Sequence, residues 1–117
     1  MILSRDAILG VADIKAEPLE VPEWGGSVYV RMLSGRERDN FEASLRDPAT
    51  GNAGNLSDFR AKFASLVIAD EKGERLFSEA DIDALGKKSA QALDRVLESG
   101  MKINALGKKD VDDLTGN

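Results

Sequence analysis

Acidic side chains outnumber basic ones in this chain, with 21 Asp and Glu against 16 Lys and Arg. Two carboxylates held together can act as general acid and base in a hydrolase. The closest candidates are Asp81 with Asp83, and a later group of Asp110, Asp112 and Asp113. Residues one or two apart do not face each other on a helix, and little apolar sequence surrounds the later group to raise a pKa. We therefore expect solvated surface carboxylates and no paired-acid catalysis.

The charged run from Asp70 to Glu74 invites comparison with a calcium loop. An EF-hand loop needs oxygen ligands at positions 1, 3 and 5, glycine at 6 and glutamate at 12. Counted from Asp70, position 3 is Lys72, and Gly73 comes at position 4. An ammonium group in the ligand shell disqualifies the site, so this run predicts a charged turn and no metal.

Histidine and cysteine are both absent from the sequence. Their absence excludes disulfides, thiolate or imidazole metal sites, and nucleophiles activated by histidine. The Trp24-Gly-Gly26 run has no lysine or helix directly after it, so it is not a phosphate-binding loop. We expect no cofactor and no enzymatic activity, and a binding or assembly module is favoured by elimination.

Length and composition indicate one modest globular domain over residues 1–117, with a polar tail at 106–117. The formal net charge of −5 disfavours nucleic acid as a partner, because phosphate binding needs a basic surface. No run approaches the ~18 apolar residues of a membrane span. The N-terminus reaches charged residues too early for a signal peptide, so we expect an intracellular protein.

The stretch from Val21 to Phe41 predicts a β-hairpin followed by a helix. Residues from Ser27 to Leu33 alternate in the manner of a half-buried strand, and Trp24-Gly-Gly-Ser27 is expected to form the turn before it. Prolines in the preceding segment predict that the first strand is an edge or irregular one. Ser34-Gly-Arg-Glu37 has the pattern of a capping box that begins a helix.

Apolar residues at helical spacing predict the remaining elements. The expected helices are a single turn at Ser4–Gly10 and a helix over Gly35–Arg46, in which Glu37, Arg38 and Asp39 stay solvated. A core helix is expected over Leu56–Ala69, capped by Asn55 or Ser57. A short helix from Ser78 to Gly86 follows, and then a helix of about five turns that begins at Ser89.

Two positions leave local alternatives open. The chain near Val67 is β-branched enough to switch to a strand, with Arg75-Leu-Phe77 returning as a small second hairpin. Gly100 either permits another backbone to approach closely or weakens the last helix. The fold predicted from these elements is α+β and mainly α, with the N-terminal hairpin packed on about three to four helices.

The order of the segments resembles tail assembly chaperones of long-tailed, lambda-like bacteriophages and prophages. The similarity covers roughly residues 19 to 106, and its motifs are structural rather than catalytic. They are Val21-Pro-Glu-Trp-Gly26, Val28-Tyr-Val-Arg31, Leu33-Ser-Gly-Arg-Glu-Arg38 with Phe41-Glu42, then Ala69-Asp-Glu-Lys-Gly-Glu-Arg-Leu-Phe77, Asp81-Ile-Asp-Ala-Leu-Gly86 and Lys88-Ser-Ala-Gln-Ala-Leu-Asp-Arg-Val96.

The resemblance implies a protein that binds the tape measure protein in the host cytoplasm before the tail tube polymerises, and that is absent from the mature virion. It also implies that a frameshifted longer form recruits the major tail tube protein. A small acidic module is suited to cover apolar stripes and keep a complex soluble. Weak contacts suffice if the copies also touch one another, so self-association is expected.

The candidate contact surface is Trp24 with exposed hairpin residues, or a groove beside the last helix with Met101, Ile103 and Leu106. Tryptophan is enriched at binding hot spots, although Trp24 also suits a lid over the core. Two rival functions remain: a structural tail component, such as a tube or connector protein, and a small regulatory binding module.

Overall fold

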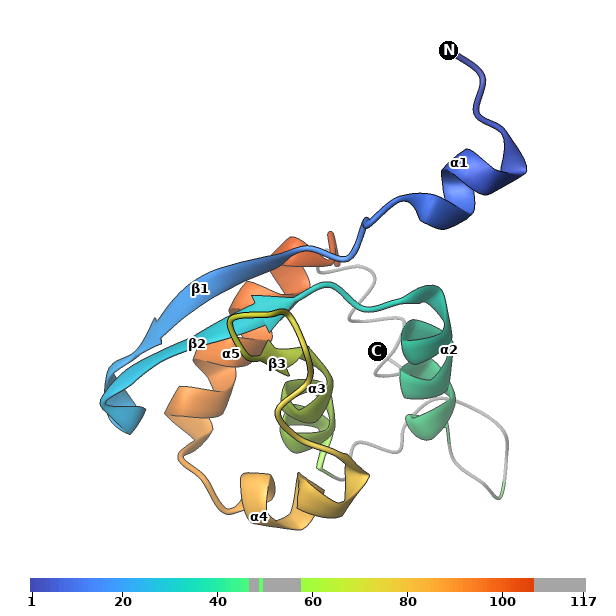
Figure 1. Cartoon of the computed structure of the whole chain (residues 1–117). Coiled ribbons are helices and arrows are strands. Elements are labelled where there is room, and N and C mark those ends of the chain that lie inside the picture. The colour runs from blue at the N-terminus through green and yellow to red at the C-terminus, as the bar shows by residue number, and fades with distance from the viewer. Residues whose placement is uncertain (47–48, 50–57, 107–117) are drawn as a thin grey trace.

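The computed structural model describes residues 1–46, 49 and 58–106. Figure 1 shows a β-hairpin lying across two helices, with a third helix to one side and a short helix at the far end. Helix α5 (Ala90–Ile103) contacts both hairpin strands, and α3 (Phe59–Val67) packs beside α5. The predicted fold, α+β and mainly α with an N-terminal hairpin, is confirmed.

Strand β1 (Ala16–Val21) pairs antiparallel with β2 (Gly26–Arg31) and forms the outer edge of the sheet. This is the predicted edge position, which accommodates Pro18 because an edge strand leaves one row of groups unpaired. The turn lies earlier than expected. Pro22–Trp24 forms the 3-10 turn η1, Gly25 follows at φ +72°, and Gly26 already pairs with Val21.

A third strand completes the sheet. The chain switches from α3 directly into β3 (Ile68–Ala69), which pairs with the other side of β2. The Asp70–Gly73 turn then returns the chain so that Arg75 forms a bridge with Ala69. The alternative of a strand after Val67 and a tiny second hairpin is therefore confirmed.

Helix α2 (Gly35–Ser44) begins at the predicted capping box and ends before the predicted Arg46. The Ser34 hydroxyl accepts from the Glu37 N–H at 3.1 Å, and the Glu37 carboxylate accepts from the Ser34 N–H at 3.0 Å. These bonds satisfy two donors that the first helical turn leaves free.

The other helices follow the apolar spacing. Helix α3 starts at Phe59 after Asp58, while Asn55 and Ser57, the predicted capping residues, lie outside the described residues. The 3-10 turn η2 (Glu79–Asp81) leads into α4 (Ile82–Gly86), which matches the short helix predicted from Ser78. Helix α5 begins after Ser89, whose hydroxyl accepts from the Ala92 N–H.

The core joins the two long helices to the sheet. Its largest fully buried side chains include Phe63, Val67 and Val96. Gly100 of α5 lies against the ring of Phe63, where a Cβ would stand 2.5 Å from Cε2. The close approach expected at Gly100 is therefore real, but the neighbour is an aromatic ring and not a backbone.

The first fifteen residues, which we call the arm, extend away from this body (Figure 1). Helix α1 (Arg5–Gly10) lies within the arm, where the sequence predicts a single turn at Ser4–Gly10, and the Ser4 side chain caps it. Every residue from 1 to 15 is exposed. The hydrogen bond from the Met32 N–H to the Lys15 carbonyl ties the end of the arm to the sheet.

Candidate protein-interaction surface

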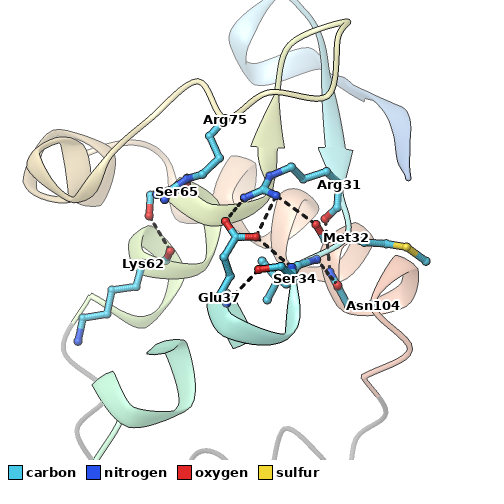
Figure 2. A network of polar contacts seen from close by, with 9 residues as sticks. Arg31, Met32, Ser34, Glu37, Lys62, Ser65, Arg75 and Asn104 are labelled. Carbon is cyan, nitrogen blue, oxygen red and sulfur yellow. Dashed lines mark hydrogen bonds and ion pairs between the residues drawn. The ribbon is translucent and has the colours of Figure 1, made fainter. Parts of the chain in front are cut away.

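Arg31, the last residue of β2, is the centre of a polar network (Figure 2). Its side chain is 9% exposed, and its guanidinium faces the Glu37 carboxylate from α2. Arg31 Nη1 donates to Glu37 Oε1 at 3.0 Å, and Nη2 donates to Oε2. Such a two-pronged pair has fixed geometry, so it sets the angle between β2 and α2. The prediction that Glu37 stays solvated is wrong because this pair draws it inward.

Asn104 connects the end of α5 to the end of β2 (Figure 2). Its Oδ1 accepts from the Leu33 N–H at 2.7 Å, and its Nδ2 donates to the Gly100 carbonyl at 2.8 Å. Nδ2 also reaches the Arg31 carbonyl at 3.4 Å. The strand ends at Arg31 and not at the predicted Leu33, because the Leu33 N–H bonds to this side chain instead of to a neighbouring strand.

The environment of Glu37 makes it a structural group. Burial acts to raise its pKa, but hydrogen bonds from Arg31 and from the Ser34 N–H outweigh it and hold the pKa below its usual value. The pKa of exposed Glu23 is also lowered, by a backbone hydrogen bond and by Arg95. A carboxylate with a low pKa is a weak general base at neutral pH, so neither group is poised for catalysis.

The other carboxylates singled out from the sequence hold turns. Asp81 accepts from the Ser78 N–H at 2.8 Å, while Asp83 is exposed. Asp70 accepts from the N–H groups of Lys72 and Glu74, as expected for a charged turn. Within residues 1–46, 49 and 58–106, no three acidic residues gather as a metal site would require. The group at 110–113 lies outside the described residues.

Trp24 is half-buried and lines an apolar pocket between the hairpin tip and α4. We call this the Trp24 pocket; its volume is about 410 Å³, and its lining is Trp24, Phe77, Asp81, Ala84, Leu85 and Lys88. Trp24 is partly buried and packs against the core, and the rest of its side chain stays accessible. Sequence reasoning missed the other pocket residues because separate segments contribute them.

The three candidates on and after α5 lie elsewhere. Met101 and Ile103 are half-buried, whereas Leu106 is 9% exposed and belongs to the core. They lie near the end of α5 that Asn104 joins to β2. Arg95, closer to the start of α5, pairs at 2.8 Å with Glu23, which is next to Trp24 in the sequence. The nine residues from Arg95 to Asn104 span about 14 Å. The structure therefore does not bring Trp24 together with Met101 and Ile103.

A second cleft, of about 580 Å³, lies between α2, α3 and η2. Charged residues are prominent in its lining, among them Glu37, Lys62, Arg75, Glu79 and Asp83. It is therefore less suited to an apolar ligand than the Trp24 pocket.

Comparison with known proteins identifies the family. A family model for phage tail assembly chaperones matches residues 5–115. The chain belongs to the phage tail assembly chaperone family. Among solved structures, this chaperone is similar to the tail assembly chaperone of bacteriophage HK97, with a TM-score of 0.61 and 19% identity over 80% of this chain and 84% of that one. No curated protein matches it.

These findings confirm the resemblance noted in the sequence, and the shared fold agrees with the HK97 structure. Membership of a chaperone family points to a role without catalysis, in the assembly of phage tails. Among the helices that the structure describes, none is long and apolar enough to cross a membrane.

Proposed function

We propose that this chaperone binds the tape measure protein of a long-tailed phage and keeps it soluble until the tail tube polymerises around it. The complex forms in the cytoplasm of the host bacterium, and the chaperone leaves before the virion matures. The family supports a role in tail assembly. The identity of the partner is our proposal.

The main support for this proposal is the apolar surface that the acidic chain leaves exposed. Among the described residues, eight large apolar residues are at least 45% exposed, seven of them in the arm, and Met101 and Ile103 at the end of α5 are half-buried. Contiguous exposed apolar surface on a soluble protein marks sites of protein interaction. A net charge of −5 supplies the repulsion that keeps a coated partner dispersed.

The tape measure contact that we propose is the surface of Met101 and Ile103. A tape measure protein is expected to be long, helical and apolar-striped, so one copy would cover only a short part of it. Copies that touch one another gain affinity through effective concentration, and each contact can be weak. A longer frameshifted form would then recruit the tail tube protein from the C-terminal tail, which lies outside the described residues.

Co-expression with the tape measure protein tests this function. We expect the tape measure protein to move from the insoluble to the soluble fraction, and to co-purify with tagged chaperone. An unrelated acidic protein of the same size, expressed in parallel, is the control for charge alone. No gain in soluble tape measure protein over that control would refute the proposal.

The rival function, a structural component of the tail, makes the opposite prediction for finished particles. Mass spectrometry of purified tails is expected to find the tape measure protein and not this chain. Stoichiometric recovery of this chain from mature tails would favour the rival. Capture of one defined host protein, without tape measure protein, would favour a regulatory module.

A further inference from the structure

Most of the exposed large apolar residues in the described chain lie in the arm. Seven of its side chains are between 45% and 110% exposed: Met1, Ile2, Leu3, Ile8, Leu9, Val11 and Ile14. Helix α1 is capped by Ser4 and none of its residues is buried, so its apolar side chains are open to a partner.

The same chain carries a receptor of matching chemistry. The Trp24 pocket is lined mainly by Trp24, Phe77, Ala84 and Leu85, and its volume of about 410 Å³ accommodates two aliphatic side chains. Ile8 and Leu9 are the exposed aliphatic residues of α1. The charged residues on the two sides are also complementary. The pocket carries Asp81 and Lys88, and α1 carries Arg5 and Asp6.

The arm and the pocket lie at opposite ends of the hairpin. The arm leaves the sheet at Lys15, which bonds to Met32, whereas Trp24 follows the other end of β1. A strand of six residues spans about 20 Å. An arm that points away from its own body (Figure 1) is therefore placed to reach the pocket of another copy.

The distribution of charge favours a contact between the arm of one copy and the body of another over a contact between the bodies of two copies. Residues 1–15 contain two basic residues, Arg5 and Lys15, and two acidic ones, Asp6 and Asp13, so their formal net charge is 2 − 2 = 0. The rest of the chain then carries the whole charge of −5. Two acidic bodies repel each other, while a neutral apolar arm meets an acidic body without that penalty.

We propose that the arm of one copy docks in the Trp24 pocket of the next, with Ile8 and Leu9 against Trp24, Phe77 and Leu85. Because each copy gives an arm and receives one, the contact is head-to-tail and extends into an open chain or a ring. This deepens the self-association that is part of the proposed function. It assigns the Trp24 pocket to a second copy and leaves Met101 and Ile103 for the tape measure protein.

Sedimentation velocity on the purified full chain, without tape measure protein, tests the docking. The wild type is expected to form oligomers larger than dimers as its concentration rises. An arm variant (Ile8→Asp with Leu9→Asp) and a pocket variant (Ala84→Glu) are each expected to be monomeric. All of these positions are exposed, and circular dichroism will verify that both variants fold.

Mixing the two variants gives the decisive result. The pocket variant still has an arm and the arm variant still has a pocket, so the mixture is expected to form heterodimers and nothing larger. Failure to form heterodimers overturns the proposal, and so does a monomeric wild type. The matched controls, Ala12→Asp in the arm and Ala80→Glu in the second cleft, are expected to behave as wild type.

Two further outcomes would also overturn the proposal. If Ala80→Glu is monomeric and Ala84→Glu is not, the arm docks in the second cleft. If the arm variant oligomerises normally yet fails to solubilise the tape measure protein, the arm belongs to that partner. Charge exchange tests the register: Asp6→Lys and Lys88→Asp should each weaken association about tenfold, and the double variant should recover most of it.

Discussion

Gly100 of α5 lies directly against the ring of Phe63 of α3. The ring of Phe63 occupies the space that a side chain at position 100 would need, and its Cζ would lie 3.0 Å from an added Cβ. Phe63 is itself fixed, because it is 1% exposed and its ring packs 5.5 Å from that of Phe41, centroid to centroid. The glycine therefore sets how near the two helices lie.

Gly100→Ala is expected to destabilise the protein, although alanine is the better helix former. Overpacking a core typically costs 1–3 kcal/mol, and the gain in helix propensity returns about 1, so the net loss should be about 1 kcal/mol. Urea denaturation measures it. In a Phe63→Leu background the same substitution should cost less, because the ring is gone. A more stable Gly100→Ala protein would contradict this packing.

The Arg31–Glu37 pair predicts a specific loss of stability in acid. The pKa of Glu37 is lower in the folded than in the unfolded state. The contribution of Glu37 to the free energy of unfolding is therefore complete above the unfolded pKa of about 4.3. It is lost as the pH falls through the folded pKa. Glu37→Gln should cost about 2 kcal/mol at pH 7, because it leaves Arg31 buried without its counter-charge.

Urea denaturation of both proteins between pH 7 and pH 3 tests this prediction. The wild type should lose more stability than Glu37→Gln over that range, so their curves should converge. Glu42→Gln is the control: Glu42 forms an exposed pair with Arg38, and its loss should cost less than 1 kcal/mol. Parallel curves for wild type and Glu37→Gln would contradict the assignment.

Asn104, the C-cap residue of α5, is expected to matter more for stability than the polar residues on the exposed face of that helix. Asn104→Ala removes the acceptor of the Leu33 N–H and should cost about 2 kcal/mol in urea denaturation. Asn104→Asp keeps that acceptor but places a carboxylate oxygen against the carbonyl oxygens of Gly100 and Arg31, so it should also destabilise the protein. Gln91→Ala, at an exposed position of the same helix, should change little. Equal stability of Asn104→Ala and Gln91→Ala would refute the role.

Trp24→Ala is expected to weaken capture of the tape measure protein while the helical circular dichroism stays nearly intact. The indole is only half-buried, so its loss should cost about 2 kcal/mol of stability, less than for a fully buried Trp. Capture falls because copies that no longer contact one another lose avidity. Tyr29→Ala, at another half-buried aromatic residue of the hairpin, is the control and should retain capture. Unfolding of Trp24→Ala would show that Trp24 acts only in the core.

Local patterns predicted most of the elements. The alternation before Ser34 and the spacing of Ser34 to Glu37 specify a strand, a cap and a helix start through contacts within a few residues. The same is true of Ser4 and Ser89. These interactions are short-range, so the sequence contains both partners and their spacing. Even the switch from helix to strand after Val67 was visible in its β-branched residues.

Contacts between distant segments were not visible. The sequence placed Glu37 in solvent, because nothing local indicates that Arg31 from the strand reaches it. The bond between the Asn104 side chain and the Leu33 N–H joins residues 71 apart, and nothing in either segment indicates it. The hairpin turn lies nearer the N-terminus than predicted, because Pro22 favours a 3-10 turn that begins at that residue.

The sequence by itself determined the absence of histidine and cysteine chemistry, the acidic charge, the element types and the resemblance to tail assembly chaperones. Only the tertiary structure decided which apolar residues stay uncovered. Leu106 and Ile8 are both aliphatic side chains with charged residues close by in the sequence, yet one is buried in the core and the other is 56% exposed. That difference depends on whether another part of the chain packs against the residue, and spacing along one segment carries no information about it.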